Sequence, residues 1–244
     1  LVIVDYPSAE EQADENKTLL YTPLPMGIIS TPDYVITVCI EENLTISDMA
    51  EGRVKGLQTA MKTRFLLLTL LRIAQRFLVY LKQIDKISSS TEQRLHLSMR
   101  NKELIQLLGL EKSLVYFSTS LKSDEVTLEK ILRGRIIKLY EEDEDLLEDV
   151  LIEVKQAIEM CNIYSGILSG TMDAFASVIS NNLNIVMKIL TAITIVMAIP
   201  NMVFSFYGMN VTGLPFPVWW VPVVISIVIA GVGAFILVKK DMFH

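Results

Sequence analysis

Small and polar side chains recur along one predicted helix face in the C-terminal half of this chain. Steps of three and four residues, which keep to one face of a helix, trace the row. Its members are Gly170, Asp173, Ser177, Ser180, Asn184, Met187, Thr191, Thr194, Ala198, Asn201 and Ser205. Polar groups in a membrane helix are costly when they face lipid, so the row either packs against other helices or lines a path for ions. The spacing alone leaves both interpretations open.

Other kinds of chemistry lack the residues that they need. The 244 residues include two histidines, His96 and His244, and two cysteines, Cys39 and Cys161, without CxxC spacing. This composition argues against a zinc site or a disulfide framework. We find no set of nucleophile, base and orienting group and no phosphate-loop motif, so we expect no enzyme. The net charge of -6 predicts no nucleic-acid surface.

Two apolar stretches near the C-terminus define the elements that carry the row. Residues 189–238 contain no Asp, Glu, Lys, Arg or His. Residues 189–207 and 218–238 each approach the roughly 20 residues that cross a bilayer as a helix. We therefore expect two transmembrane helices joined by an external loop at 208–217, where glycines and prolines break helices. The alternative, a hairpin buried in a soluble protein, fits poorly with so long a segment without charge.

Charges flanking the two spans predict their orientation. Lys188 precedes the first span, and Lys239 and Lys240 follow the second. These lysines lie at the same membrane face, so the positive-inside rule places both chain ends, including the tail at 239–244, in the cytoplasm. The chain begins with Leu1 in a strand-like run, and we expect an N-terminal portion to be missing.

Proline placement organises the part before the membrane. Residues 33–199 are free of proline, which predicts a long helical region. Upstream, residues 19–22, 26–30 and 34–40 are short apolar or β-branched runs, predicted as strands separated by proline-containing turns. We expect a small α/β part over residues 1–57.

Apolar residues recur with helix period from about residue 58 onward. Three antiparallel helices are predicted over 58–140. The first runs to about 87 and is followed by a cap at 88–91, the second covers 91–108 and is ended by Gly109, and the third covers 111–133. A fourth helix is predicted from about 142 to 205. Its first part is a stalk at 141–188, and it continues without a break into the first span. Because so long a helix cannot bury both faces within one subunit, we expect several copies to bundle around an axis.

Two short sequences around the first span resemble the signature of the CorA family of divalent-cation channels. Residues 186–191 precede the span, and Tyr207, Gly208, Met209 and Asn210 follow it. The position of Gly-Met-Asn at the exit of the first of two C-terminal spans makes the match specific. The resemblance implies an α+β cytoplasmic domain, a long stalk helix and two C-terminal transmembrane helices. It also implies a homopentameric funnel in the plasma membrane of a prokaryote.

The resemblance further implies transport of Mg²⁺, and possibly of Co²⁺, through a pore lined by the first membrane helix. Tyr207, Gly208, Met209 and Asn210 would form the selectivity filter, in which Asn210 accepts hydrogen bonds from the waters of the hydrated ion. Gly208 would let the backbone turn sharply. The implied pore-lining residues are Asn184, Met187, Leu190, Thr194, Ala198 and Asn201, with Asp173 at the cytoplasmic mouth. By composition alone, Met187 and Leu190 suit simple packing as well.

Gating in the family is feedback by Mg²⁺ bound between neighbouring subunits. Asp149 matches the stalk aspartate of the family by register, and Glu41 or Glu42 is the expected partner acid. A simpler interpretation holds for the acids at 141–144, which favour the dipole of a helix N-terminus.

Two features depart from the family pattern, and two alternatives stay open. The loop at 211–217 lacks the acid that many relatives carry, and only Lys239 and Lys240 supply the C-terminal basic ring. A related branch of the superfamily moves Zn²⁺. A membrane-anchored sensor that conducts nothing would use the polar row only to pack helices.

Overall fold

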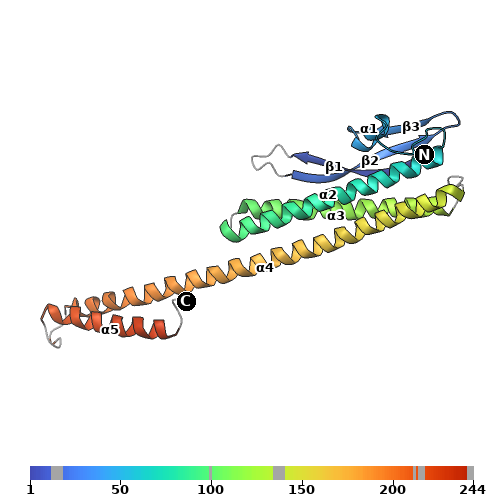
Figure 1. Cartoon of the computed structure of the whole chain (residues 1–244). Helices are drawn as coiled ribbons and strands as arrows, with labels where there is room; N and C mark the ends of the chain where they lie inside the picture. Colours follow the sequence, from blue (N-terminus) through green and yellow to red (C-terminus); the bar gives the residue numbers. More distant parts are fainter. Residues whose placement is uncertain (12–18, 99–100, 134–140, 211–212, 214–217, 241–244) are drawn as a thin grey trace. The chain divides into compact units, whose positions relative to one another are not determined.

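The computed structural model describes residues 1–11, 19–98, 101–133, 141–210, 213 and 218–240 (Figure 1). These residues form two compact units, Leu1–Met172 and Asp173–His244. The first unit contains a sheet, three helices and the first part of the long helix α4 (Glu141–Tyr207). The second contains the rest of α4 and the helix α5 (Trp220–Lys239).

Three antiparallel strands form the sheet in the order β1 (Val2–Glu11), β2 (Leu19–Ser30) and β3 (Val35–Cys39). The prediction of two separate strands within residues 19–30 is wrong, because β2 runs unbroken through Pro23 and Pro25. Both prolines lie where β2 pairs with β1 alone, since β3 pairs only from Met26 onward. At the alternate position 21, the backbone N–H points away from β1 and donates to Ser113 Oγ at 3.0 Å. The proline nitrogens share that side, so no ladder hydrogen bond is lost.

A short helix, α1 (Leu44–Ala50), follows the sheet and was missed by the sequence analysis. Asn43 caps it, because its side-chain oxygen accepts from the Thr45 N–H at 2.8 Å. Met49 is buried and its sulfur accepts from the Thr69 hydroxyl on the next helix. The contact fixes α1 against that helix.

Two long helices replace the three predicted between residues 58 and 140. Helix α2 (Lys62–Ser98) passes through the expected cap at 88–91, and α3 (Asn101–Leu132) passes through Gly109. Thr91 is fully buried, so the core stripe of α2 continues across the serines, and Ser90 Oγ donates to the Ile87 carbonyl within the helix. The Ser113 hydroxyl donates to the Gly109 carbonyl and accepts from the Tyr21 N–H of β2, so the sheet packs on α3 directly beyond the glycine. Tertiary burial thus overrides both local stop signals.

The core of the first unit lies between the sheet and the α2–α3 pair (Figure 1). Phe77 and Phe117 meet edge to face at 4.9 Å between ring centroids, and Tyr21 of β2 lies 6.3 Å from Phe117. Near the other end of the pair, Arg94 donates to Gln106 at 3.3 Å. These two contacts pair later residues of α2 with earlier residues of α3, so the helices are antiparallel as predicted.

The first part of α4 packs through a stripe of buried side chains. The stripe comprises Leu147, Val150, Val154, Ala157, Cys161 and Leu168. Two polar contacts add to it: Arg64 of α2 lies 3.9 Å from the Asp143 carboxylate, and Ser118 of α3 donates to Asn162 at 3.4 Å. The three- and four-residue spacing of the stripe is that of an amphipathic helix against a core.

In the second unit, α4 and α5 lie side by side (Figure 1). A Cβ placed on Gly233 of α5 would stand 3.1 Å from Ile199 Cδ1 of α4. The absence of a side chain at Gly233 therefore permits this close approach. Pro200 lies inside α4, which nevertheless continues to Tyr207.

Candidate functional site

The predicted filter residues lie where α4 ends. Tyr207 is the last helical residue, and the Gly208 N–H still donates to the Phe204 carbonyl at 2.9 Å. The Met209 N–H then reaches the Phe206 carbonyl at 3.4 Å, a tightened last turn. Gly208, Met209 and Asn210 are exposed in the single chain. The end of α4 therefore presents the Asn210 amide to the surroundings of the helix.

Gly208 lies in the turn that ends α4, without the positive φ angle that glycine adopts most freely. Positive φ angles occur at Gly52, Gly56 and Gly213 among the described glycines, and Gly213 has a φ of 99°. A Cβ on Gly208 would instead stand 3.1 Å from the Phe204 carbonyl oxygen. Gly208 thus serves close backbone packing, and Gly213 supplies the unusual backbone angle in the connection. The other loop residues, 211, 212 and 214–217, lie outside the described residues.

The predicted pore-lining residues share the uncovered face of α4. All six are exposed in the single chain: Asn184, Met187, Leu190, Thr194, Ala198 and Asn201. Ala192, by contrast, is fully buried, and Ile199 contacts α5. Ala192 and Asn201 are nine residues apart, which at about 100° per residue puts them on opposite faces. Asn201 is therefore turned away from the contact with α5.

Side-chain hydroxyls on this row are bonded within α4 itself. Thr194 Oγ1 donates to the Leu190 carbonyl at 2.8 Å, and Ser177 Oγ donates to the Asp173 carbonyl at 3.0 Å. Such bonds satisfy the hydroxyl protons without a partner helix and leave oxygen lone pairs outward. Asp173 is exposed at the start of the second unit. The row thus presents oxygen acceptors along the charge-poor second part of α4.

The predicted regulatory acids are all exposed in the single chain. Asp149 is exposed on α4, and Glu41 and Glu42 are exposed after β3. No group of three or more His, Cys, Asp or Glu side chains suited to a metal ion exists among the described residues.

Sequence reasoning missed a buried acidic pair between β1 and α3. Asp124 is 5% exposed, and its Oδ1 accepts from the Asp5 N–H at 3.0 Å. The Ser120 hydroxyl donates to the Asp5 carboxylate. Burial raises the pKa of Asp124 to about 8, with the nearby Asp5 charge adding to the rise and the Asp5 N–H opposing it. The period-three-to-four pattern of α3 marked this face as core but gave no sign of the strand that faces it.

Both C-terminal helices are long and apolar enough to cross a membrane. Only 6% of the most apolar window in α4 and 11% of that in α5 is buried. A core helix of a soluble protein would be mostly buried, so exposed apolar surface of this extent indicates lipid or other copies as the surroundings.

Comparison with known proteins identifies the family. The model of the family described as CorA-like Mg²⁺ transporter protein matches residues 1–240. The chain belongs to this CorA-like family. That match spans the sheet, the helices and the YGMN sequence together.

Two curated relatives of this CorA-like chain carry the name Cobalt/magnesium transport protein CorA. The one from Methanocaldococcus jannaschii is 28% identical over 225 residues, which cover 86% of this chain and 70% of the relative. The one from Thermotoga maritima is 33% identical over 141 residues, which cover 52% of this chain and 40% of the relative.

A solved structure shows the same fold. The complete structure of the CorA magnesium transporter from Methanocaldococcus jannaschii aligns with a TM-score of 0.75 at 22% identity. The alignment covers 98% of this chain and 74% of that one. The expected fold class, with a small sheet, packed helices, a long helix and a C-terminal apolar helix, is confirmed.

Proposed function

We propose that this chain transports Mg²⁺, and also Co²⁺, across a membrane as one subunit of a homopentamer. The family match over residues 1–240 carries the proposal. The names of the two curated relatives favour magnesium and cobalt over the zinc alternative and over a sensor that conducts nothing. The proposed role is that of a transporter without enzymatic activity.

The polar row of α4 lines the pore in this proposal. Support comes from its exposure in the single chain and from its position opposite Ala192 and Ile199, which face the chain's own contacts. One chain has no second wall for a pore, so other copies must supply the rest of it. Five copies of α4 around an axis place Asn201, Thr194 and Asn184 in successive polar rings, with Asp173 at the cytoplasmic mouth. Met187 and Leu190 form an apolar constriction that excludes ions by dewetting when the pore is closed.

The filter at Asn210 works on the hydrated ion. Mg²⁺ gives up its waters reluctantly, so a ring of neutral amide oxygens that accepts hydrogen bonds from those waters avoids most of the dehydration cost. A ring of carboxylates would hold the ion more tightly and slow its exit. The position of Asn210 three residues beyond the end of α4 supports this role.

Mg²⁺ uptake into proteoliposomes tests the filter. Asn210→Ala removes the amide, and we expect the uptake rate to fall at least about tenfold, equivalent to ~1.4 kcal/mol on the barrier. Asn182→Ala is the matched control, because Asn182 is an exposed asparagine of α4 outside the polar row. Unchanged uptake in Asn210→Ala would remove Asn210 from the filter. Uptake of Zn²⁺ alone by the wild type would favour a zinc transporter. Uptake of no cation at all would favour a sensor that conducts nothing.

Regulation is proposed to occur at an interface between copies. Asp149 of one copy and Glu41 or Glu42 of its neighbour hold Mg²⁺ and favour the closed pore. Their exposure in the single chain supports this placement. In the same liposomes, Asp149→Asn should keep transporting when millimolar Mg²⁺ on the cytoplasmic face suppresses the wild type. Separate Glu41→Gln and Glu42→Gln variants decide which acid is the partner, and suppression that survives in all three variants would contradict the site.

The proposed location is the plasma membrane of a prokaryote with both chain ends in the cytoplasm. Lys188 at the start of the first span and Lys239 and Lys240 after the second support that orientation. A cysteine placed at Lys240 should react with a membrane-impermeant maleimide only after the cells are opened. Labelling in intact cells would reverse the orientation.

A further inference from the structure

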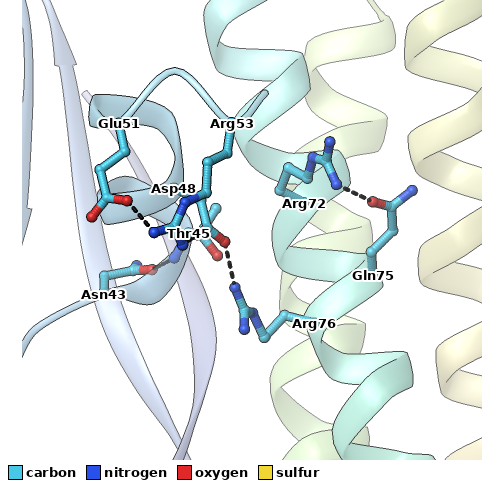
Figure 2. Close-up of polar contacts among 8 residues, drawn as sticks. All are labelled: Asn43, Thr45, Asp48, Glu51, Arg53, Arg72, Gln75 and Arg76. Atoms are coloured by element: carbon cyan, nitrogen blue, oxygen red, sulfur yellow. Dashed lines mark hydrogen bonds and ion pairs between the residues drawn. The ribbon is translucent and has the colours of Figure 1, made fainter. Parts of the chain in front are cut away.

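A cavity of about 290 Å³ lies between α1 and α2 in the first unit (Figure 2). Its polar lining consists of Thr45, Asp48, Arg53, Arg72, Gln75 and Arg76, and two valines complete the wall. Three guanidinium groups therefore share one cavity in a chain whose net charge is -6. This local concentration of positive charge favours the binding of an anion.

Two of the three arginines are held in place by one carboxylate. Asp48 Oδ1 accepts from Arg53 at 3.0 Å, and Asp48 Oδ2 accepts from Arg76 at 2.9 Å (Figure 2). Arg53 also contacts the Glu51 carboxylate. The Asp48–Arg76 pair crosses from α1 to α2, whereas the pairs of Arg53 stay within α1 and the loop after it. Together they fix two guanidinium groups at the cavity wall. Preorganised donors lose less entropy when they bind a ligand.

The third arginine has no counter-charge in the described part of the chain. The recorded contact of Arg72 is with the amide oxygen of Gln75, at 3.5 Å, the outer limit of a hydrogen bond (Figure 2). Arg72 and Arg76 are four residues apart on α2, where two like charges repel. Three positive groups face two carboxylates, Asp48 and Glu51, so the cluster keeps a net positive charge. An anion beside Arg72 would neutralise that charge and relieve the repulsion.

The donors match phosphate best. Each guanidinium presents paired N–H groups in a planar fork that bonds two oxygens of a phosphate at once. The Gln75 amide and the Thr45 hydroxyl add neutral donors. The cavity is larger than one phosphate group needs, so it has room for a chain of phosphates or for a phosphate with an organic substituent.

We propose that this cavity binds a small phosphate-bearing anion, with Arg72 as the principal contact and Arg76 and Arg53 as preorganised supporting donors. The site lies in the first unit, remote in sequence from the polar row and from Asp149. It is independent of the proposed transport function. The bound anion bridges Arg72 and Arg76 of α2 to Arg53 of the loop after α1 and so rigidifies the contact between α1 and α2.

Isothermal titration of the purified full chain in detergent tests the site. The probes are inorganic phosphate, pyrophosphate and ATP, each at the same ionic strength, in Mg²⁺-free buffer with EDTA, so that chelation of Mg²⁺ by the probe adds no heat. Arg72→Gln removes one charge and no ion pair, and we expect it to weaken binding by at least about tenfold, as the loss of a charge-assisted hydrogen bond would. Arg133→Gln is the control, because Arg133 is exposed just after α3 and loses only a solvent-exposed ion pair with Glu129.

The three probes separate the sources of the phosphate. Binding of pyrophosphate as tightly as ATP identifies the phosphate chain as the recognised part, and tighter binding of ATP identifies a nucleotide. Either result with selective loss in Arg72→Gln supports the site. Absence of binding by all three probes at millimolar concentration overturns the proposal, and so does equal weakening in Arg72→Gln and Arg133→Gln, which would indicate unspecific attraction. Circular dichroism of both variants checks that the helices are intact.

Discussion

At the scale of single residues, the Asp124 carboxyl is the most strongly perturbed group with a clear structural cause. It lies buried between α3 and β1, with the Asp5 N–H bonded to it and the Asp5 carboxylate nearby. Its pKa is about 8, above the ordinary value of 3.8. Between these two pH values the folded chain binds one proton more than the unfolded chain. Stability therefore falls as the pH rises from about 4 to about 8 and levels off above that.

Asp124→Asn tests this linkage. The amide keeps an oxygen acceptor for the Asp5 N–H and cannot ionise, so the variant should show a flatter pH dependence and exceed the wild type in stability at pH 8 and above. The wild-type slope amounts to at most about 1.4 kcal/mol per pH unit. Thermal unfolding followed by circular dichroism between pH 5 and 9 measures it. Asp33→Asn, at an exposed aspartate, should keep the wild-type slope; identical profiles for all three proteins would contradict the assignment.

The two cysteines differ in the reactivity that their surroundings allow. Cys161 lies in the buried stripe of α4, and burial raises its pKa to about 12, against a smaller opposing effect of Lys122. A thiol that stays protonated is a poor nucleophile. Cys39 is partly exposed at the end of β3. Labelling or crosslinking experiments therefore need only Cys39 to be replaced.

At the scale of elements, sequence patterns succeeded where burial and local signals agree. Both apolar helices and the long helix were placed within a few residues, because a charge-free run of membrane length has few other solutions. They failed where tertiary contacts override local signals: Pro23 and Pro25 sit on an unpaired side of β2, and Thr91 is buried within α2. Helix α1 is short, and its signal was only the Asn43 cap.

The candidate sites show the same division. Helix period placed the polar row on one face of α4, and the structure leaves that face uncovered. The arginine cavity could not be predicted from the sequence, because Arg53 comes close to Arg76 only through the fold of the loop after α1. The spacing of Arg72 and Arg76 was the one local signal of it.

Close packing of α4 against α5 depends on Gly233. A side chain there would meet Ile199 Cδ1 at 3.1 Å, whereas a Cβ on Gly231 would meet nothing within 4 Å. Gly233→Leu should lower stability in detergent by about 1–3 kcal/mol through overpacking. Gly231→Leu is the control on the same helix. Ile199→Ala should recover part of the loss in the double variant, because the two positions are in contact. If the stability losses of Gly233→Leu and Ile199→Ala simply add in the double variant, the destabilisation does not come from contact between these two positions.

At the scale of the whole molecule, the two faces of α4 are expected to make different contacts in an assembly of several copies. Leu190, one of the predicted pore-lining residues beside the polar row, is 56% exposed, and Ile199, nine residues later on the opposite face, contacts α5 of the same chain. Copies arranged around an axis with the row inward bring the residues at position 190 close together and keep those at position 199 apart. A stripe that packed only within the chain would bring neither position near its counterpart.

Cysteine crosslinking separates these arrangements. In a Cys39→Ser background, Leu190→Cys should form a covalent dimer under mild oxidation in the membrane, and Ile199→Cys should not. Cys161 adds no background, since it is buried with a raised pKa. Crosslinks at both positions would indicate collision of misfolded chains. Crosslinks at position 199 alone would show that the polar row faces away from the axis. A dimer at position 190 alone, together with a pentameric mass in native mass spectrometry, requires the polar row of α4 to face a shared axis, which is the geometry that ion transport along it needs.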